Sequence, residues 1–295
     1  MVSAYSSFSS LEMSPLSAVM GMRVHDLDLA DGVSDTQLAA IRAALAEHCI
    51  LLFPAQHRLS PAGHIEFSRQ LGQLEDHVLK DFCLPGHPEI FVVSNIIEDG
   101  QHIGAYNGSK TYHSDLAYLP EPSMGSVFRC LECPPEGGET AFINMFAAYA
   151  ALPDERKQWL AGRSVVFDYA WDYERRHGGV RPPLTEVQKA RVPAIEQPCV
   201  RRHPESGKPA LFVSPTWVRA FAGMSDEESQ PVLDELLEFA CDDRFAYYHS
   251  WSPHDVLIWD NRSTMHRVCP YDNDGTRRLM HRTTVKGEAP IAWAH

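Results

Sequence analysis

The segments Thr-Tyr-His-Ser-Asp-Leu at 111–116 and Val-Leu-Ile-Trp-Asp-Asn-Arg-Ser-Thr-Met-His at 256–266 decide the fold of this chain. The first contains His113 and Asp115 in the pattern His-x-Asp, and in the second His266 follows an apolar run. Side chains alternate along an extended segment, so His113 and Asp115 are predicted to reach one metal ion from the same side. Two imidazoles and one carboxylate can bind iron(II) by one face and leave the opposite face open.

The third ligand lies in the other half of the sequence from the first two, and no linker divides the chain. One fold must therefore bring both halves together, and we expect a single domain over residues 1–295. Residues 1–15 are Ser-rich and are expected to be poorly ordered. Residues 168–192 are polar, rich in Arg, Gly and Pro, and lack clear periodicity. They are predicted to form a long excursion that acts as a lid.

Hydrophobic periodicity predicts many short strands and few helices. Helices are expected from Ser34 or Asp35 to Glu47, from Pro61 to Leu71, in two pieces between 147 and 160, and over 226–241. Strands are expected at 21–28, 49–53, 89–94, 125–130, 140–144, 246–250, 256–259 and 279–285, with a hairpin at 199–203 and 210–214. This content favours a mostly β (α+β) fold, a double-sheet jelly roll with helical cover.

Composition excludes several classes of function. The 295 residues carry a net charge of −13, and an acidic surface repels phosphate backbones, so nucleic acid is not an expected partner. No apolar run has the length of a membrane helix, and no basic segment followed by an apolar stretch opens the chain. The seven cysteines are odd in number and scattered, which predicts free thiols in the cytoplasm. Cys130 and Cys133 have the spacing of a zinc knuckle but lack a second pair of ligands nearby.

Two arginines supply fixed positive charge near the C-terminus. Arg278 and Arg282 are four residues apart, so on an extended strand they point to the same side. A planar guanidinium recognises a carboxylate through two parallel hydrogen bonds, which lysine cannot do. This spacing suits two anions that enter one cavity. Ser109 and Tyr112 precede the metal motif and are candidates for substrate contact.

Three segments carry a resemblance to a known family. Residues 112–149 (YHSDLAYLPEPSMGSVFRCLECPPEGGETAFINMFAAY) and 259–284 (WDNRSTMHRVCPYDNDGTRRLMHRTT) resemble the iron-binding regions of the taurine dioxygenase and chlorophenoxyacetate dioxygenase (TauD/TfdA) family. Residues 65–74 (IEFSRQLGQL) are similar to its N-terminal helix and following turn. The resemblance extends from about residue 20 to residue 286 and implies a distorted double-stranded β-helix that binds iron(II) and 2-oxoglutarate.

The resemblance also assigns roles residue by residue. His113, Asp115 and His266 match the metal ligands of the family. Arg278 matches the arginine that binds the distal carboxylate of 2-oxoglutarate, and Thr140 matches the threonine whose hydroxyl contacts the same carboxylate. Arg282 and His77 match residues that contact the anionic group of the substrate.

The expected reaction is hydroxylation of a C–H bond in a small anionic organic substrate, a carboxylate or sulfonate, at the expense of 2-oxoglutarate and O2. Succinate and CO2 are released, and a hydroxylated product that bears a leaving group on the same carbon can then break apart. Members of this family are often dimers or tetramers, so the resemblance also implies a homo-oligomer.

Two alternatives remain open from the residues. A zinc-dependent hydrolase or lyase could use the same three ligands, because three protein ligands are normal for catalytic zinc. That alternative leaves Arg278 and Thr140 without a role. A non-catalytic jelly-roll protein that binds a small molecule is the second alternative.

Overall fold

The structure is a computed structural model that describes residues 11–76, 80–106 and 109–293. Within these ranges no helix combines the length and the apolar character needed to cross a bilayer. All seven cysteines lie in the described chain and are free thiols, as the scattered spacing predicted.

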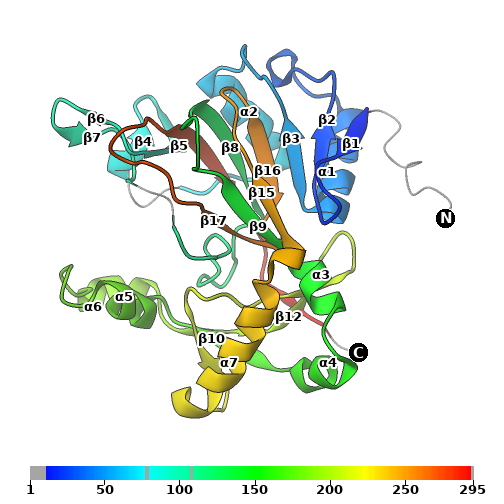
Figure 1. Cartoon of the computed structure of the whole chain (residues 1–295), viewed down its shortest axis with the longest axis vertical. Helices are drawn as coiled ribbons and strands as arrows, with labels where there is room; N and C mark the ends of the chain where they lie inside the picture. Colours follow the sequence, from blue (N-terminus) through cyan, green and yellow to red (C-terminus); the bar gives the residue numbers. More distant parts are fainter. Residues whose placement is uncertain (1–10, 77–79, 107–108, 294–295) are drawn as a thin grey trace.

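An eight-stranded sheet fills one half of the molecule (Figure 1). Its strand order is β1-β2-β3-β16-β8-β18-β5-β4. The bounds are β1 Met13–Pro15, β2 Met22–Val24, β3 Ile50–Phe53, β16 Val256–Asp260, β8 Gly125–Glu132, β18 Leu279–Val285, β5 His87–Ser94 and β4 Cys83–Leu84. Every residue of β3 and β16 is buried, which explains why both appear in the sequence as continuous apolar runs rather than as alternating patterns.

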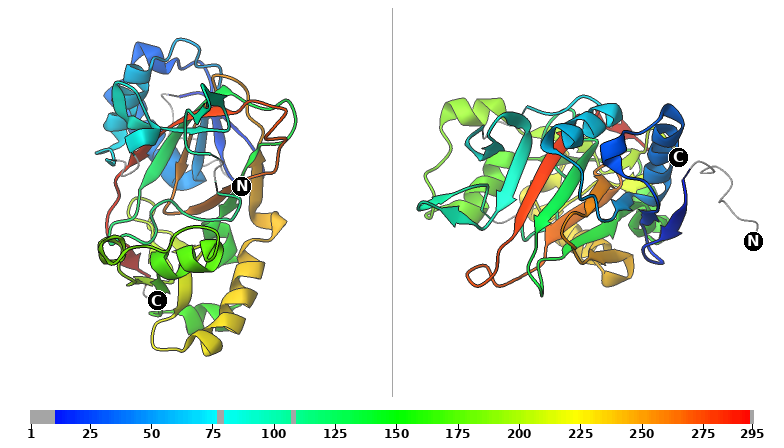
Figure 2. Two further views of the ribbon diagram at one scale, coloured as in Figure 1. Left: turned by 90° about the vertical axis from the view of Figure 1, so that its left-hand side faces the viewer. Right: turned by 90° about the horizontal axis from the view of Figure 1, so that it is seen from above.

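Two helices cover one face of this sheet (Figure 2). Helix α1, Asp35–His48, begins with a capping box between Ser34 and Gln37, and helix α2, Pro61–Leu71, begins after the N-cap Ser60. Both helices begin where the sequence predicted. Their apolar side chains pack with strand residues in one core cluster that includes Ile41, Leu45, Phe67, Leu51, Phe53, Val127 and Ile258.

A three-stranded sheet lies against the other face and places the candidate ligand His266. Its order is β15-β9-β17, with bounds β15 Ala246–His249, β9 Thr140–Asn144 and β17 Thr264–Val268. Trp259 of the large sheet packs on Phe142 of β9 and on His266 of β17, with ring centroids 5.6 and 4.7 Å apart. The buried layer between the two sheets therefore reaches the candidate metal site directly.

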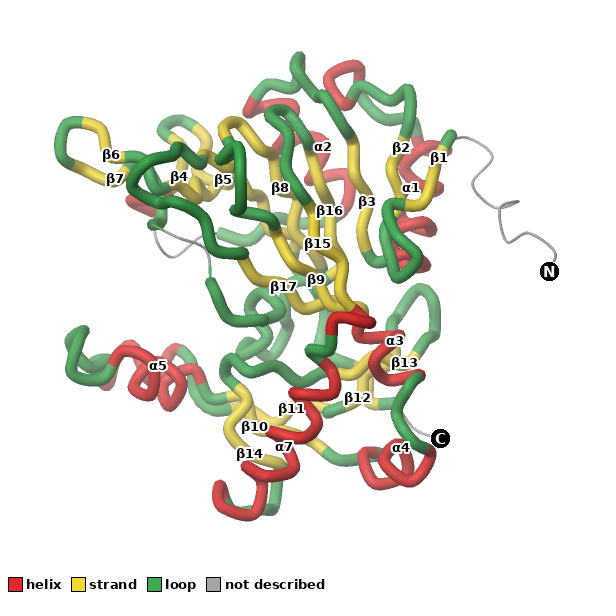
Figure 3. The backbone as a smooth tube through the Cα atoms, in the orientation of Figure 1, coloured by secondary structure: helices red, strands yellow, loops and turns green. Residues whose placement is uncertain are grey.

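The other half of the molecule holds the helices α3 to α7 with short strands between them (Figure 3). The bounds are α3 Met145–Ala150, α4 Asp154–Leu160, α5 Tyr169–His177, α6 Glu186–Arg191, α7 Asp226–Ala240, β10 Ser164–Phe167, β11 Ile195–Pro198, β12 Val200–Arg202, β13 Pro209–Leu211, β14 Val218–Phe221 and β19 Ile291–Ala292. Strands β6 Ile97–Glu98 and β7 Gln101–His102 form a separate hairpin. The predicted hairpin at 199–203 and 210–214 is β12 paired with β13.

Two sequence predictions about irregular segments were wrong in part. Residues 168–192 contain α5 and α6, each begun by a side-chain cap, at Asp168 and at Thr185. Helix α6 is exposed along its whole length, whereas α5 is partly buried but charged at four of its nine positions, so neither carries the long apolar stripe that periodicity detects. Within 1–15, residues 13–15 form β1, which pairs with β2; residues 1–10 lie outside the described part of the chain.

A buried ion cluster fixes the turn between β16 and β17, which leads to His266. Asp260 is fully buried; it accepts hydrogen bonds from Arg262, at 2.7 and 2.9 Å, and lies 3.0 Å from Nε2 of His203. Arg262 also donates to Glu205 at 2.8 Å. Burial opposes ionisation, but Arg262 and His203 hold the pKa of Asp260 well below its usual range. Three members of this cluster, His203, Glu205 and Asp260, could ligate a metal by distance, but both carboxylates are already paired with the Arg262 guanidinium.

We expect Asp260→Ala to lower the free energy of unfolding by about 3 kcal/mol, because it leaves the Arg262 guanidinium without its main buried partner. Urea denaturation at neutral pH measures the change. Asp31→Ala, which removes an exposed ion pair with Arg58, is the matched control and should leave the midpoint nearly unchanged. Equal effects of the two substitutions would contradict a stabilising role for the buried cluster.

Candidate metal centre and active site

Two backbone hydrogen bonds bring the distant histidines together. The His113 N–H donates to the His266 carbonyl at 3.1 Å, and the His266 N–H donates to the His113 carbonyl at 2.8 Å. This isolated bridge attaches the 111–116 segment to the edge of β17. The two imidazole centroids lie 4.3 Å apart as a result.

The ligand atoms of the three predicted residues face one another. Nε2 of His113 lies 3.7 Å from Oδ1 of Asp115, and Nε2 of His266 lies 3.9 Å from Oδ2 of Asp115. The ligand atoms of the triad all lie within 4.8 Å of one another, and the three residues are buried. Nδ1 of His113 lies 3.0 Å from the Thr111 carbonyl, which can only accept, so Nδ1 carries the proton and the Nε2 lone pair is free for a metal. The donor set fits a divalent transition metal.

Asp115 does not lie on a continuous strand, contrary to the sequence prediction. The extended segment ends at Ser114, whose hydroxyl points away and donates to the Thr264 carbonyl, and a turn begins at Asp115. Leu116, next in the chain, has a φ of 57°, in the left-handed region. The carboxylate still faces the histidines because the Asp115 N–H donates to the Asn261 side chain at 3.3 Å.

Two further side chains hold the Asp115 carboxylate. Ser126 on β8 donates to Oδ2 at 2.8 Å, and Arg282 on β18 donates to Oδ1 at 3.1 Å. Burial would raise the pKa of Asp115, but Arg282 and the two histidines hold it well below its usual range. Burial lowers the pKa of His113, and burial together with His113 lowers the pKa of His266 to about 3. The triad therefore offers one carboxylate and two neutral imidazoles at neutral pH.

Arg278 is buried beside this centre without an anionic partner. Its side chain is 3 % exposed, and no described carboxylate lies within ion-pair distance of it. Nε has no hydrogen-bond partner, and burial lowers the pKa of the guanidinium. The side chain of Asn95 fixes the backbone by accepting from the Arg278 N–H at 2.8 Å. Burial of an unpaired guanidinium is costly, so the site is built to receive an anion.

One cavity joins this arginine to His113 and His266. It is lined by Val93, Ser109, His113, Phe128, Thr140, Trp259, His266, Val268, Arg278 and Arg282. The structure thus brings together both arginines, as their four-residue spacing predicted. Thr140 Oγ1 accepts from Trp251 Nε1 at 3.0 Å, which leaves the threonine proton available to donate into the cavity.

The other residues predicted to contact the substrate are Ser109, Tyr112 and His77, and only the first of them lines the cavity within the described chain. Ser109 lines the cavity, and its hydroxyl donates to the Thr111 carbonyl at 3.0 Å. Tyr112 is buried in a core cluster beneath Arg267, whose guanidinium lies 4.9 Å from the tyrosine ring. The cavity lining does not include Tyr112, so this position gives no support to its prediction as a substrate contact. His77 lies outside the described residues.

Sequence reasoning missed an aromatic group that begins at His113. The Trp217 ring meets the His113 ring edge-on at 5.7 Å, and Tyr118 lies 4.9 Å from Trp217 and 4.7 Å from Tyr169. Tyr169 is the first residue of α5, so the 168–192 excursion is connected to the metal centre through these rings. Trp217 has a φ of 70°, and its buried Nε1 has no described partner. No motif in the sequence marks these residues, because only the fold brings the three segments together.

The buried His-Asp-His centre, with an unpaired arginine beside it, has the donor set of a two-histidine, one-carboxylate metal site. A family model described as Taurine catabolism dioxygenase TauD, TfdA family matches residues 12–284. The chain therefore belongs to this family, as the resemblance of residues 112–149 and 259–284 predicted.

Characterised relatives and solved structures match nearly the whole chain. The (S)-phenoxypropionate/alpha-ketoglutarate-dioxygenase of Delftia acidovorans is 31% identical, covering 92% of this chain and 94% of the relative. The alpha-ketoglutarate-dependent 2,4-dichlorophenoxyacetate dioxygenase of Cupriavidus pinatubonensis is 30% identical, covering 94% and 98%. A taurine dioxygenase structure from Burkholderia xenovorans superposes with a TM-score of 0.80 at 29% identity, covering 96% and 91%. The chain is thus an alpha-ketoglutarate-dependent dioxygenase with mixed α/β structure, mostly sheet.

We expect Ser126→Ala to weaken binding of iron(II) about tenfold, because the substitution removes a hydrogen bond that orients the Asp115 carboxylate. Anaerobic titration of the metal-free chain with iron(II) measures the affinity. Ser68→Ala is the matched control, because Ser68 is an equally buried serine that bonds to His64 and Thr283 instead. Unchanged affinity in Ser126→Ala would show that the serine has no part in positioning the ligand.

Proposed function

We propose that this chain uses iron(II), 2-oxoglutarate and O2 to hydroxylate a C–H bond of a small anionic organic substrate. The observation that carries the proposal is the buried Arg278, which has no described anionic partner and shares a cavity with His113 and His266. An enzyme that bound only a metal and a neutral substrate would gain nothing from this costly group.

The triad would hold iron(II) through Nε2 of both histidines and the carboxylate of Asp115. Three neighbours set this arrangement: the Thr111 carbonyl fixes the tautomer of His113, and Ser126 and Arg282 orient Asp115. With iron(II), 2-oxoglutarate and O2 bound, such a centre supplies the oxidant for C–H hydroxylation and releases succinate and CO2.

Arg278 and Thr140 would bind the distal carboxylate of 2-oxoglutarate. The guanidinium offers a planar pair of donors, and Thr140 adds a hydroxyl donor from the facing sheet. Phe128 and Trp259 form apolar walls of the same cavity, which exclude water and strengthen the charge interaction.

The substrate would lie beside Arg282 and the aromatic residues Tyr118, Tyr169 and Trp217. Two relatives take phenoxypropionate and 2,4-dichlorophenoxyacetate, which join an aromatic ring to a carboxylate. Arg282 is already paired with Asp115, so it can contribute to the substrate only the guanidinium atoms that Asp115 does not use. If the hydroxylated carbon bears an ether oxygen or a sulfonate, the product breaks at that bond, so cleavage follows hydroxylation.

Four structural expectations accompany this function. We infer that the two facing sheets form the distorted double-stranded β-helix of the family and that the whole chain acts as one catalytic domain, because both halves supply metal ligands. The 168–192 excursion is proposed as a lid, since Tyr169 at its start packs on Tyr118 near the metal site. A homodimer or tetramer is expected from the family, and sedimentation of the full chain would measure it.

A succinate-release screen tests the reaction and the substrate class together. The iron(II)-loaded chain is incubated in air with 2-oxoglutarate and aryloxyacetates, aryloxypropionates, sulfonates or amino-acid derivatives. Substrate-dependent succinate is expected with iron(II) and O2. Turnover with zinc in the absence of O2 would favour the hydrolase or lyase alternative and overturn the proposal. Membership of the dioxygenase family already favours the enzyme over a non-catalytic binding protein.

We expect Arg278→Gln to weaken 2-oxoglutarate binding by about 2 kcal/mol or more, roughly 30-fold, because the ligand loses its charged partner in a buried site. Anaerobic titration of the iron(II)-loaded protein with 2-oxoglutarate, followed by its visible absorption, measures the change. Arg277→Gln, which removes the neighbouring exposed guanidinium, is the control and should have little effect.

Arg282→Gln should affect the binding of iron(II) and of the substrate, whereas Arg278→Gln should affect the binding of 2-oxoglutarate. It removes a donor from Asp115, so it should weaken iron(II) binding and raise the substrate KM more than the 2-oxoglutarate KM. The two KM values and the iron affinity are measured on the same preparation. Equal effects of both substitutions on 2-oxoglutarate would show that the two arginines do not have separate partners.

A further inference from the structure

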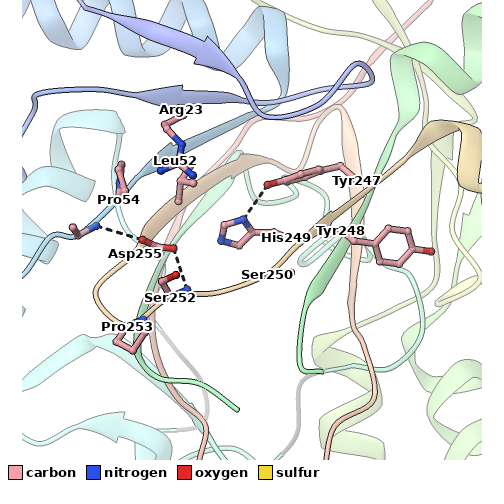
Figure 4. Close-up of a pocket in the computed structure, with 11 residues that line it drawn as sticks. Arg23, Leu52, Pro54, Tyr247, Tyr248, His249, Ser250, Ser252, Pro253 and Asp255 are labelled. Carbon is pink, nitrogen blue, oxygen red and sulfur yellow. Dashed lines mark hydrogen bonds between the residues drawn. The ribbon is translucent and has the colours of Figure 1, made fainter. Parts of the chain in front are cut away.

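Arginines outside the catalytic cavity differ in whether a carboxylate balances their charge. Figure 4 shows the hollow at Arg23, which is bordered by the loop that precedes β16. Asp255 lines the same hollow and is close enough for Arg23 to oppose the rise that burial causes in the pKa of this carboxyl. One charge of each sign is present there, so that hollow favours no anion. An arginine pair on helix α5 has a different balance.

One face of α5 is joined to the metal centre by aromatic rings. Tyr169 and Arg176 are seven residues apart, about two helical turns, so both lie on this face. The Tyr169 ring lies 4.7 Å from the Tyr118 ring, and Tyr118 lies 4.9 Å from Trp217. Trp217 in turn meets the His113 ring edge-on. Arg176 therefore extends from the same helix face that packs toward the metal centre.

The charge of this face is positive in sum. Asp172 is fully buried and accepts from Nη2 of Arg175 at 2.7 Å and from Nε of Arg176 at 2.7 Å. Within the described chain neither arginine forms an ion pair with another carboxylate. Two guanidiniums thus share one carboxylate, and one positive charge is left in excess. The Arg176 side chain is 29 % exposed and Asp172 does not use its Nη1, so a ligand can reach this nitrogen.

The Arg176 guanidinium acts on groups at the metal centre. Burial raises the pKa of Tyr169, and Arg176 opposes this rise. Burial is also the main cause of the lowered pKa of His113, and Arg282 and Arg176 add to that effect. Of these two arginines, Arg282 is already paired with the metal-centre carboxylate of Asp115. Arg176 is therefore the cation near His113 whose charge the protein balances less completely.

Two carboxylates limit where a substrate anion can lie. Burial is the main cause of the raised pKa of Tyr118, and both Asp115 and Glu75 add to it, so both carboxylates are near this ring. An anion beside Tyr118 is repelled by them, whereas the excess positive charge on α5 attracts it. The anionic end of a substrate should therefore point toward Arg176.

We propose that Arg176 binds the anionic group of the substrate and makes the enzyme specific for anions. This inference rests on the proposed function, because it assigns a residue to the substrate of that site. A carboxylate or sulfonate accepts from the guanidinium, and the apolar part of the substrate lies on the rings of Tyr169 and Tyr118. Because α5 belongs to the proposed lid, a bound substrate would also hold the lid against the metal centre.

The probe is 2-phenoxypropionate, and 2-phenoxypropionamide is its neutral counterpart. Calorimetric titration of the chain loaded with iron(II) and 2-oxoglutarate, without O2, measures binding and not turnover. The unmodified chain should bind the carboxylate about tenfold or more tightly than the amide, because only the carboxylate makes charge-assisted hydrogen bonds. Arg176→Gln should weaken carboxylate binding about tenfold and give the two probes similar Kd values. Arg176→Lys, which keeps the charge, should restore part of the loss.

Arg175→Gln is the matched control. It removes the other guanidinium of the pair, which donates to the Pro215 carbonyl at 3.2 Å and lies 5.1 Å from the Trp171 ring. Carboxylate binding should weaken no more than about threefold, because a charge that does not touch the ligand acts only through a screened field. Each substitution leaves Asp172 one arginine partner, so both variants should fold, and thermal unfolding checks this.

The contrary results are distinct. Equal losses in Arg176→Gln and Arg175→Gln would assign the effect to the net charge of α5 and would overturn a contact with Arg176. A preference for the carboxylate that survives in Arg176→Gln would show that another residue holds the anion. An unmodified chain that binds neither probe, or binds both equally, would also reject the proposal. The proposed reaction is tested separately by succinate release, so its failure would not be mistaken for any of these outcomes.

Discussion

The pair of backbone hydrogen bonds between His113 and His266 is the interaction on which the active site depends. Without it, the segment that carries the first two proposed ligands would lose the contact that sets the distance between the two imidazoles. The bridge works because β17 is itself held by β9 and because the Asp260–Arg262 cluster fixes the turn before it. The geometry of the proposed metal site is thus set by backbone hydrogen bonds of His113 and His266 themselves and by a buried ion pair a few residues away.

Charge in the cavity is distributed unequally. Arg282 is paired with Asp115, so its charge is balanced within the protein, whereas Arg278 is buried with no described anion beside it. Both arginines enter one cavity because they lie four residues apart near β18, and they differ because only one of them meets a protein carboxylate. An electrostatic imbalance of this kind favours a bound anion over water, because a buried unpaired charge is costly. The proposed binding of 2-oxoglutarate rests on this difference.

Much of the fold could be predicted from local pattern. Capped helices such as 35–48 and 61–71 and apolar runs such as 50–53 and 256–260 appear at or within a residue or two of the predicted bounds. The prediction missed the two helices within 168–192, one exposed along its whole length and the other partly buried but rich in charged residues. Their N-caps, Asp168 and Thr185, were signals that the composition of the segment obscured.

The sequence by itself determined the ligand types, the two-residue spacing of His113 and Asp115, and the four-residue spacing of the arginines, because these are properties of a short stretch of backbone. Only the tertiary structure decided that Asp115 lies in a turn, that Ser126 and Arg282 hold its carboxylate, and that Arg278 is left without a protein anion. These contacts join segments far apart in the chain, and no local pattern encodes which strand lies opposite another. The same reason explains why the aromatic residues beside His113 were found only in three dimensions.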